Sequence, residues 1–421
     1  MSAITENKQG LKVLFAGAFL QLFLGIIYVW SVFKNPVSAY FGWNPVDVGL
    51  TASFMLCFFV IGILAGGKAQ TKLSLRLVVL IGGLMVAAGM LATSFIPRGI
   101  LDIKKVVDNT VSLEYVSSAP VFLIYIFYGV IGGFGVGMAY NAIITAAQKW
   151  FPKNRGFATG ITVCAFGLST VIFAPLVTKM NNIFNGSVNN TFLILAGVFA
   201  AAVLLLFSFI KSPEQIPSAA GSAPVLKGKQ YTTLEMIKTP RFYLIAFSLM
   251  FGTSVFFIIN PDLKDLAQNR GMESFATYLV MFVGIANALG RLGAPLMSDK
   301  IGREGADIII LLITALGAFG LCFAQGVLLI VIIAFVAFCY GGYSGLYPVL
   351  TSENFGIKNI GSNYGAVMIG FMLSALLFPI VINKIDNQQL RFMILGILAA
   401  VGAVLIIILK IINTKRAKET E

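Results

Sequence analysis

Residues 120–148 read PVFLIYIFYGVIGGFGVGMAYNAIITAAQ, an apolar stretch without a charged side chain. A helix needs about 20 apolar residues to cross the hydrocarbon core of a bilayer, and this stretch is long enough. Eleven further apolar stretches occur along the chain. We therefore predict a polytopic membrane protein of the all-α class with twelve transmembrane helices. The predicted spans are residues 11–33, 46–66, 75–96, 120–148, 155–178, 191–210, 241–261, 274–297, 305–323, 326–351, 361–383 and 390–411.

The composition of the 421-residue chain indicates that a lipid bilayer surrounds it. Apolar residues make up 58% of the chain and charged residues only 11%, which differs strongly from an ordinary soluble domain. This composition excludes soluble enzymes. The net charge of +13 does not indicate nucleic-acid binding, because Lys and Arg gather in short loops and at the carboxyl-terminal tail.

A polar stretch rich in Ser, Pro, Ala and Lys separates the sixth and seventh predicted spans. We predict that residues 211–240 are a cytoplasmic linker between an amino-terminal six-helix bundle, 1–210, and a carboxyl-terminal six-helix bundle with a basic tail, 241–421. An even number of spans places both termini on one side. Loops on that side are rich in Lys and Arg, whereas the loop 97–119 is balanced in charge. The positive-inside rule therefore predicts cytoplasmic termini in the inner (plasma) membrane.

Arg291 is the clearest charged residue deep within a predicted span, about two turns before the polar loop that follows. A charge at the middle of a span costs on the order of 2.5–3.5 kcal/mol on insertion scales, so it needs a protected cavity and a partner. One interpretation is that Arg291 caps carbonyl groups or pairs with Glu353. The other is that a substrate carboxylate completes the pair through two parallel hydrogen bonds. Asn287 lies one turn earlier on the same helix face and would offer amide donors to that anion.

Several tyrosines lie within predicted spans, where a buried hydroxyl group needs a hydrogen-bond partner. Each of them alone fits helix packing with one local hydrogen bond. As a set around one arginine, they would instead line a small polar pocket. These tyrosines are Tyr28, Tyr140, Tyr340 and Tyr343.

The sequence offers no clear group for catalysis, for a metal or for a cofactor. It contains no His, and its four Cys residues lie in apolar stretches without a CxxC pair, so we expect no enzyme. Residues 62–68 begin like a phosphate-binding loop, but Ala69 stands where Ser or Thr is required. We expect no acid in the core of a span. The energy source is left open between exchange, the substrate gradient and a proton.

Several motifs resemble the major facilitator superfamily and, more narrowly, the oxalate/formate antiporter family, which is related to the monocarboxylate transporters. The resemblance implies two pseudo-symmetric six-helix bundles and secondary active transport. The segments that carry it are residues 82–89, 133–160, 235–242, 293–304, 340–342 and 363–365.

This resemblance also implies roles for single residues. Arg291 falls at the substrate-binding arginine of the eighth span, and Tyr140 and Tyr340 fall at aromatic positions of the cavity. Asp299 and Arg303 fall where the superfamily uses charges as a conformational latch on the inward side. In the corresponding loop of the first half, Thr71 stands where an acid is usual.

Family members that carry dicarboxylates use a lysine in the eleventh span, and Phe371 occupies that position here. A second carboxylate would then be buried without a partner at a cost of several kcal/mol. We therefore expect a monomeric transporter, by symport or antiport, of monocarboxylates such as lactate, pyruvate or formate, with a proton as candidate co-substrate. The alternatives are an oxalate/formate-type dicarboxylate exchanger and a membrane-embedded sensor without transport. The candidate substrate-binding residues are Arg291, Asn287, Tyr140, Tyr340, Tyr28 and Phe371.

Overall fold

The computed structural model describes residues 7–98, 100–107, 110–116, 119–215, 229–261, 263–268, 270, 272 and 276–420, and a helix lies within each predicted span. Ten helical stretches are long and apolar enough to cross a membrane. They are Lys8–Phe41 (α2 Lys8–Leu24, η1 Gly25–Val29 and α3 Trp30–Phe41), Pro45–Ala69 (α4), Leu75–Ser94 (α5), Phe122–Trp150 (α6 Phe122–Ile124, η2 Tyr125–Gly132 and α7 Gly133–Trp150), Arg155–Ile183 (α8), Val188–Phe209 (α9 Val188–Leu206 and η3 Phe207–Phe209), Pro240–Ile259 (α11), Gly326–Phe355 (α15), Ile360–Ile382 (α16) and Gln388–Arg416, which belongs to α17 (Gln388–Thr420).

Two further long helices occupy the places of the eighth and ninth predicted spans. They are α13 (Ala276–Ile301) and α14 (Arg303–Gly320), and α14 carries three charged residues near its start. The short elements η4 (Pro213–Gln215), α10 (Thr233–Met236) and α12 (Leu263–Gln268) lie in the connections. The expected twelve-helix class is therefore confirmed.

The ends of several helices follow directly from the local sequence. Asn44 precedes α4, its side-chain oxygen accepts a hydrogen bond from the Val46 amide at 2.9 Å, and Pro45 takes the first helical position. Thr239 caps α11 in the same way. Gly42 ends α3 in the left-handed conformation, with φ 74°, which glycine adopts at little cost.

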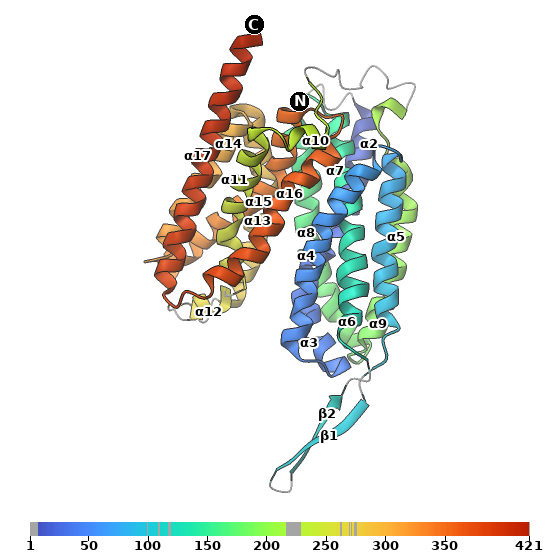
Figure 1. Ribbon diagram of the computed structural model, residues 1–421. Coiled ribbons are helices and arrows are strands. Elements are labelled where there is room, and N and C mark those ends of the chain that lie inside the picture. Colours follow the sequence, from blue (N-terminus) through green and yellow to red (C-terminus); the bar gives the residue numbers. More distant parts are fainter. Residues whose placement is uncertain are drawn as a thin grey trace.

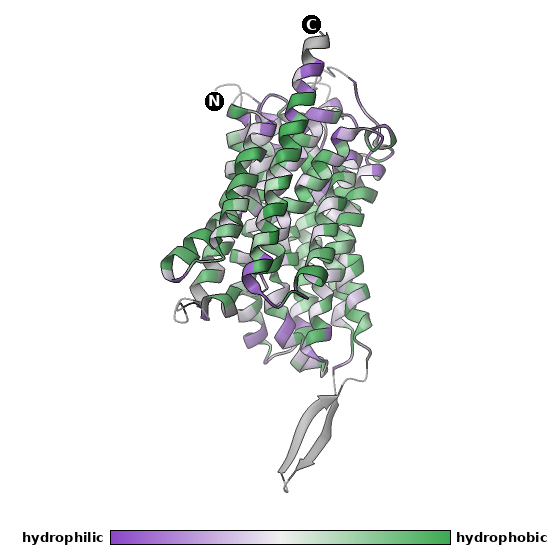
Figure 2. Ribbon diagram, turned by 60° about the vertical axis from the view of Figure 1, so that its left-hand side comes forward, coloured by the Kyte–Doolittle hydropathy of each residue, from purple (hydrophilic) through white to green (hydrophobic). Residues whose placement is uncertain are grey.

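The helices form two bundles that stand side by side (Figure 1). Helices α2 to α9 pack among themselves, and α11 to α17 do the same. Both ends of the described chain lie at the same end of the molecule, as the even number of spans requires (Figure 1). Hydrophobic residues cover the length of the helices, while hydrophilic residues gather toward the two ends (Figure 2). This distribution fits a bundle that is surrounded by lipid.

The predicted loop 97–119 contains a β-hairpin that the sequence analysis did not expect. Strand β1 (Ile100–Val107) pairs antiparallel with β2 (Thr110–Val116), from Ile100 opposite Val116 to Val107 opposite Thr110. Both strands are rich in β-branched residues, which favour extended structure. The hairpin projects from the end opposite the termini and lies outside the helical bundles (Figure 1).

The two bundles meet through α8 with α13 and α15, and through α16 with α4 and α7. Gly67 of α4 lies so close to Gly361 of α16 that an added Cβ would be 2.2 Å from the Gly361 carbonyl carbon. The side-chain amide of Asn141 donates to the Gly361 carbonyl oxygen at 2.8 Å. These contacts lie toward the end that carries the termini, so the bundles are joined at that end.

Close helix packing within the first bundle depends on Gly137, where an added Cβ would lie 2.0 Å from the Phe59 carbonyl oxygen. We expect Gly137→Ala to lower the free energy of unfolding by about 1–3 kcal/mol, because α7 and α4 must move apart. Gly197→Ala is the matched control, since an added Cβ there meets nothing within 4 Å. Thermal unfolding of the purified variants measures both effects, and an equal loss in the two would contradict the interpretation.

Candidate functional site

The candidate site centres on Arg291 of α13, whose side chain is only 1% exposed. Arg291 lies ten residues before the end of α13 at Ile301, which is about 15 Å along a helix axis. That distance places it near the middle of a hydrocarbon core about 30 Å thick. The guanidinium group is therefore both deep in the expected membrane and enclosed by protein.

Side chains from both bundles hold the guanidinium group. Its Nε donates to Asn287 Oδ1 at 2.9 Å within α13, and one terminal nitrogen donates to the Tyr28 hydroxyl of η1 at 3.0 Å. The guanidinium carbon also lies 5.2 Å from the centre of the Tyr28 ring and 5.7 Å from that of Phe166 in α8, both within cation–π range. Arg291 thus crosses from the second bundle into the first.

The backbone of α8 leaves room for this crossing at Gly167. A Cβ added there would lie 2.8 Å from Arg291 Cδ and 2.9 Å from Arg291 Nε. Any larger residue at this position would push the arginine out of its place. Gly167 therefore shapes the site through the absence of a side chain.

No carboxylate forms an ion pair with Arg291 among the residues that the structure describes. The interpretation that Arg291 pairs with Glu353 is wrong, because Glu353 lies 3.0 Å from the Nε of Arg303 instead. The described hydrogen bonds of Arg291 go to neutral side chains. Its positive charge is thus surrounded by oxygen dipoles and aromatic rings.

The predicted tyrosine set assembles in part. Tyr28, Tyr140 and Tyr340 all interact electrostatically with the Arg291 guanidinium. Tyr343 does not belong to the site, because its hydroxyl bonds Thr314 at 2.7 Å and the Ile310 carbonyl at 3.3 Å inside the second bundle.

Phe371 takes part in an aromatic wall beside the tyrosines. Its ring centre lies 6.1 Å from that of Tyr340 and 5.1 Å from that of Phe257. Tyr340 in turn stacks on Phe256 with 4.0 Å between ring centres. The side of the site that α11, α15 and α16 form is therefore apolar and aromatic.

Tyr364 of α16 is a site residue that the sequence analysis did not select. It interacts electrostatically with Arg291 and Tyr140, and its buried hydroxyl has no hydrogen-bond partner in the described part of the chain. Phe166 and Gly167 were missed as well. Their helix is apolar throughout, so nothing in the local pattern distinguishes them, whereas the deep position of Tyr364 in a predicted span was a usable signal.

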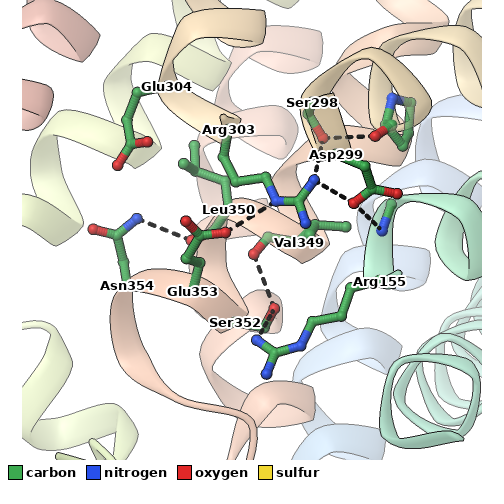
Figure 3. A network of polar contacts seen from close by, with 12 residues as sticks. Arg155, Ser298, Asp299, Arg303, Glu304, Val349, Leu350, Ser352, Glu353 and Asn354 are labelled. Carbon is green, nitrogen blue, oxygen red and sulfur yellow. Dashed lines mark hydrogen bonds and ion pairs between the residues drawn. The ribbon is translucent and has the colours of Figure 1, made fainter. Parts of the chain in front are cut away.

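Figure 3 shows a second polar cluster, at the end of α13 and the starting turn of α8 and beside the end of α15. Asp299, at the end of α13, accepts hydrogen bonds from the amides of Gly156 at 3.2 Å and Phe157 at 2.9 Å. These amides begin α8, so a carboxylate of the second bundle caps a helix of the first. Arg303 binds Asp299 at 2.6 Å and Glu353 at 3.0 Å. The two predicted latch residues therefore lie together at a contact between the bundles.

A buried acid that the sequence analysis did not select lies about one turn after the start of α14, near the end of a span and not in its core. Asp307 of α14 is 0% exposed, and neither carboxylate oxygen has a hydrogen-bond partner among the described residues. Tyr347 and Tyr343 of α15 interact with it, as does Glu304 on its own helix. The hydroxyl oxygen atoms of Tyr347 and Ser248 of α11 lie 2.8 Å apart and share a hydrogen bond.

Within the described residues, no group of three or more Cys, Asp or Glu side chains is placed to hold a metal ion. The four Cys residues are free thiols.

The fold and the site together define a class: a helical membrane transporter with a polar site between two bundles. A sequence profile of the Major Facilitator Superfamily matches residues 14–379, so the chain belongs to that superfamily.

Relatives of known sequence agree with this assignment. The chain is 27% identical to an oxalate:formate antiporter of Oxalobacter formigenes over 81% of its own length and 76% of the relative's. It is 24% identical to an uncharacterized MFS-type transporter, YhjX, of Escherichia coli (strain K12), covering 85% and 83% of the two chains. It is 23% identical to monocarboxylate transporter 12 of Xenopus laevis, covering 91% and 84%.

Solved structures show the same fold. The proton:xylose symporter XylE superposes with a TM-score of 0.67 at 18% identity, covering 94% of each chain. The Escherichia coli fucose:proton symporter FucP superposes with a TM-score of 0.62 at 13% identity, covering 93% of this chain and 97% of that one. The predicted major facilitator fold is confirmed.

The contact between Asp299 and the start of α8 is expected to hold the two bundles together, which can be measured. We expect Asp299→Asn to weaken the contact between the bundles by about 1.5–3 kcal/mol, because hydrogen bonds to a charged acceptor are lost. Spin labels at the exposed positions Lys153 and Lys300, in a background without native cysteines, should then report a longer distance.

Glu304→Gln is the matched control for this measurement, because Glu304 contacts Asn413 of its own bundle at 2.8 Å. The distance distribution should be unchanged in that variant. An unchanged distribution in Asp299→Asn would show that its carboxylate does not hold the bundles together.

Proposed function

We propose that this chain is a secondary transporter of small monocarboxylates that works by alternating access between its two bundles. The single observation that carries the proposal is the buried guanidinium of Arg291, which has no carboxylate partner in the described part of the chain. A buried cation without a counter-charge is costly, and a bound anion offsets that cost. Membership in a transporter superfamily supports movement of that anion across the membrane.

The neighbours of Arg291 suggest how a carboxylate is held. The guanidinium offers several N–H donors in one plane, which matches the two oxygens of a carboxylate. Asn287 uses its oxygen to accept from Arg291 Nε, which leaves its NH₂ group as a donor. The hydroxyl groups of Tyr28, Tyr140 and Tyr364 lie around the same charge. The carboxylate would therefore meet donors from both bundles.

One cation fits one carboxylate. In the described part of the chain, Arg291 is the one cation that acts on Tyr140, Tyr340 and Tyr364. The aromatic wall that includes Phe371 suits a small apolar group such as a methyl. A second carboxylate placed against this wall would lose its hydration without gaining a partner, at a cost of several kcal/mol. This argument favours lactate, pyruvate or formate.

The two alternative functions require different properties of the site. An oxalate/formate-type dicarboxylate exchanger draws support from the name of one relative, but the aromatic wall supplies no second cation for a dianion. A membrane-embedded sensor without transport would need a site but no movement between two states. Counterflow of labelled substrate in vesicles separates transport from sensing, and competition by mono- and dicarboxylates separates the two substrate classes.

The contacts between the bundles suggest which side is open. Three contacts between the bundles lie between the level of the site and the end that carries the termini. They join Gly361 to Asn141, Asp299 to Gly156, and Arg291 to Tyr28. If the termini are cytoplasmic, as the loop charges predict, this state is closed toward the cytoplasm. Substrate would then enter from the side that carries the β-hairpin. Transport requires the latch between Asp299 and α8 to open in turn.

Arg291→Gln tests the assigned role directly. We expect kcat/KM for monocarboxylate uptake into proteoliposomes to fall by about a hundredfold, because two charge-assisted hydrogen bonds are lost. Arg291→Lys should also be impaired, since an ammonium group cannot form the paired contact. Arg98→Gln, at an exposed arginine that follows α5 and lies over the Tyr40 ring, is the control and should transport normally. Normal uptake by the Arg291→Gln variant would refute the proposal.

Asp307 is the candidate carrier if a proton is co-transported. A carboxylate that is wholly buried without a partner is more stable in its neutral, protonated form. We expect Asp307→Asn to abolish uptake driven by a pH gradient but to retain counterflow exchange, because an amide cannot release a proton. Asp47→Asn, at an exposed acid in the first turn of α4, is the control. Full pH-driven uptake in Asp307→Asn would exclude this carrier.

A further inference from the structure

The two bundles repeat one short motif at the contact between them. Residues 153–160 read KNRGFATG and residues 358–365 read KNIGSNYG, so both have the form Lys-Asn-x-Gly-x-x-x-Gly. The first begins α8 and the second begins α16, the fifth helical span of each bundle. In each case the Asn precedes the helix and its side chain makes no capping hydrogen bond. The first amides of both helices are therefore not capped by these Asn side chains, and a negative group at either amino-terminal end would be stabilising.

The start of α8 obtains its negative group from the opposite bundle. An added Cβ on Gly156 would lie 2.2 Å from the Pro295 carbonyl oxygen, and four residues after Pro295 the carboxylate of Asp299 accepts from the amides of Gly156 and Phe157. The start of α16 has the same arrangement with the bundles exchanged. Gly361 lies against Gly67 of α4, and four residues after Gly67 comes Thr71. The side chain that lies against Gly361 is the neutral amide of Gln70, whose Oε1 would be 2.6 Å from an added Cβ.

Thr71 cannot replace the carboxylate. Its hydroxyl is turned to its own helix and donates to the Lys68 carbonyl oxygen at 2.8 Å. It carries no charge, and its residue is exposed. The amino-terminal end of α16 is therefore left without the acid that the start of α8 receives.

A cavity of about 280 Å³ lies at this place, between the α4–α5 turn and the start of α16. Its lining includes Gly67, Thr71 and Gly361, which are the three residues of the incomplete contact. The size is enough for a small oxyanion with a few water molecules, each of which takes about 30 Å³ in the liquid.

Eight of the twelve residues that line this cavity have a side chain that can donate a hydrogen bond. Thr145 is 3% exposed, and its hydroxyl has no hydrogen-bond partner among the described residues. The hydroxyl of Ser74 and the side-chain nitrogen of Gln70, in two half-buried residues, also have no such partner there. Lys149 and Lys358 add positive charge to the lining. The Nζ of Lys149 also lies 3.3 Å from Oε1 of Glu214, whose side chain is 46% exposed. Glu214 therefore partly neutralises the charge of Lys149.

We propose that this cavity binds a small oxyanion, a carboxylate or a phosphate, which takes the place of the acid missing at Thr71. The anion contacts the α4–α5 turn of the first bundle and the start of α16 in the second. Its binding therefore stabilises the state in which this end of the protein is closed. The site is separate from Arg291, so it does not depend on the proposed transport function.

The test uses the purified Arg291→Gln variant in detergent without added lipid, so that the central site cannot account for binding. Sodium phosphate and sodium acetate are titrated separately at constant ionic strength while thermal unfolding is followed. We expect a saturable rise in the unfolding temperature with at least one of the two anions, because a ligand of the folded state stabilises it. A rise with phosphate alone assigns a phosphate site, and a rise with acetate alone assigns a carboxylate site. No rise with either anion overturns the proposal.

Two added substitutions connect the rise to this cavity. Thr71→Asp supplies the carboxylate within the chain, so it should raise the unfolding temperature without anion and remove the response to added anion. Lys358→Gln should increase the anion concentration at half-saturation by about tenfold, through the loss of one charge-assisted hydrogen bond. Lys300→Gln is the control, since it lies beside the site that Asp299 already fills. The proposal is overturned if all three variants respond to added anion in the same way as the parent protein.

Discussion

The structure depends on one charge that its own described side chains do not neutralise. The guanidinium of Arg291 lies near the middle of the membrane-spanning region and is held by an amide oxygen, a phenol hydroxyl and two aromatic faces. These neutral groups lower the cost of burial but leave the net charge in place. Because Tyr28 and Phe166 belong to one bundle and Arg291 to the other, the same charge also joins the two halves. Under the proposed function, the side chain that binds the anion is therefore also one that joins the two bundles.

The other buried charges show how differently the chain treats groups that serve the structure. Arg303 is fully paired, with Asp299 on one side and Glu353 on the other, and the Asp299 carboxylate also caps α8. Such a network satisfies its members and fixes a contact between the bundles. Asp307 is the opposite case, a wholly buried carboxylate without a hydrogen-bond partner among the described residues. Arg303 and Asp299 thus pair with each other within the fold, whereas Arg291 and Asp307 are the groups for which we propose a bound anion and a proton.

Much of the fold follows from the sequence, since apolar length alone decides where a helix can cross a bilayer. The depth of Arg291 and its neighbour Asn287 were likewise readable, because they share one helix. The partners of Arg291 in the first bundle were not, since Tyr28 and Gly167 are distant in sequence and only the packing of α8 on α13 brings them close. Asp307 was overlooked because it lies only two residues inside its predicted span. The hairpin was not predicted, because residues 97–119 were interpreted from their charges and not from their β-branched residues, which favour strands.

The position of Arg291 has an electrical consequence. Under the proposed function, a carrier with an empty site would move one uncompensated positive charge between its two states, whereas a carrier loaded with a monoanion would move none. A membrane potential acts on the first step with up to about 2.3 kcal/mol per 100 mV and leaves the second nearly untouched. The membrane potential would therefore affect the rate at which the empty carrier returns to its first state. An exchange cycle would not depend on the potential in this way, because its site is occupied during both conformational steps.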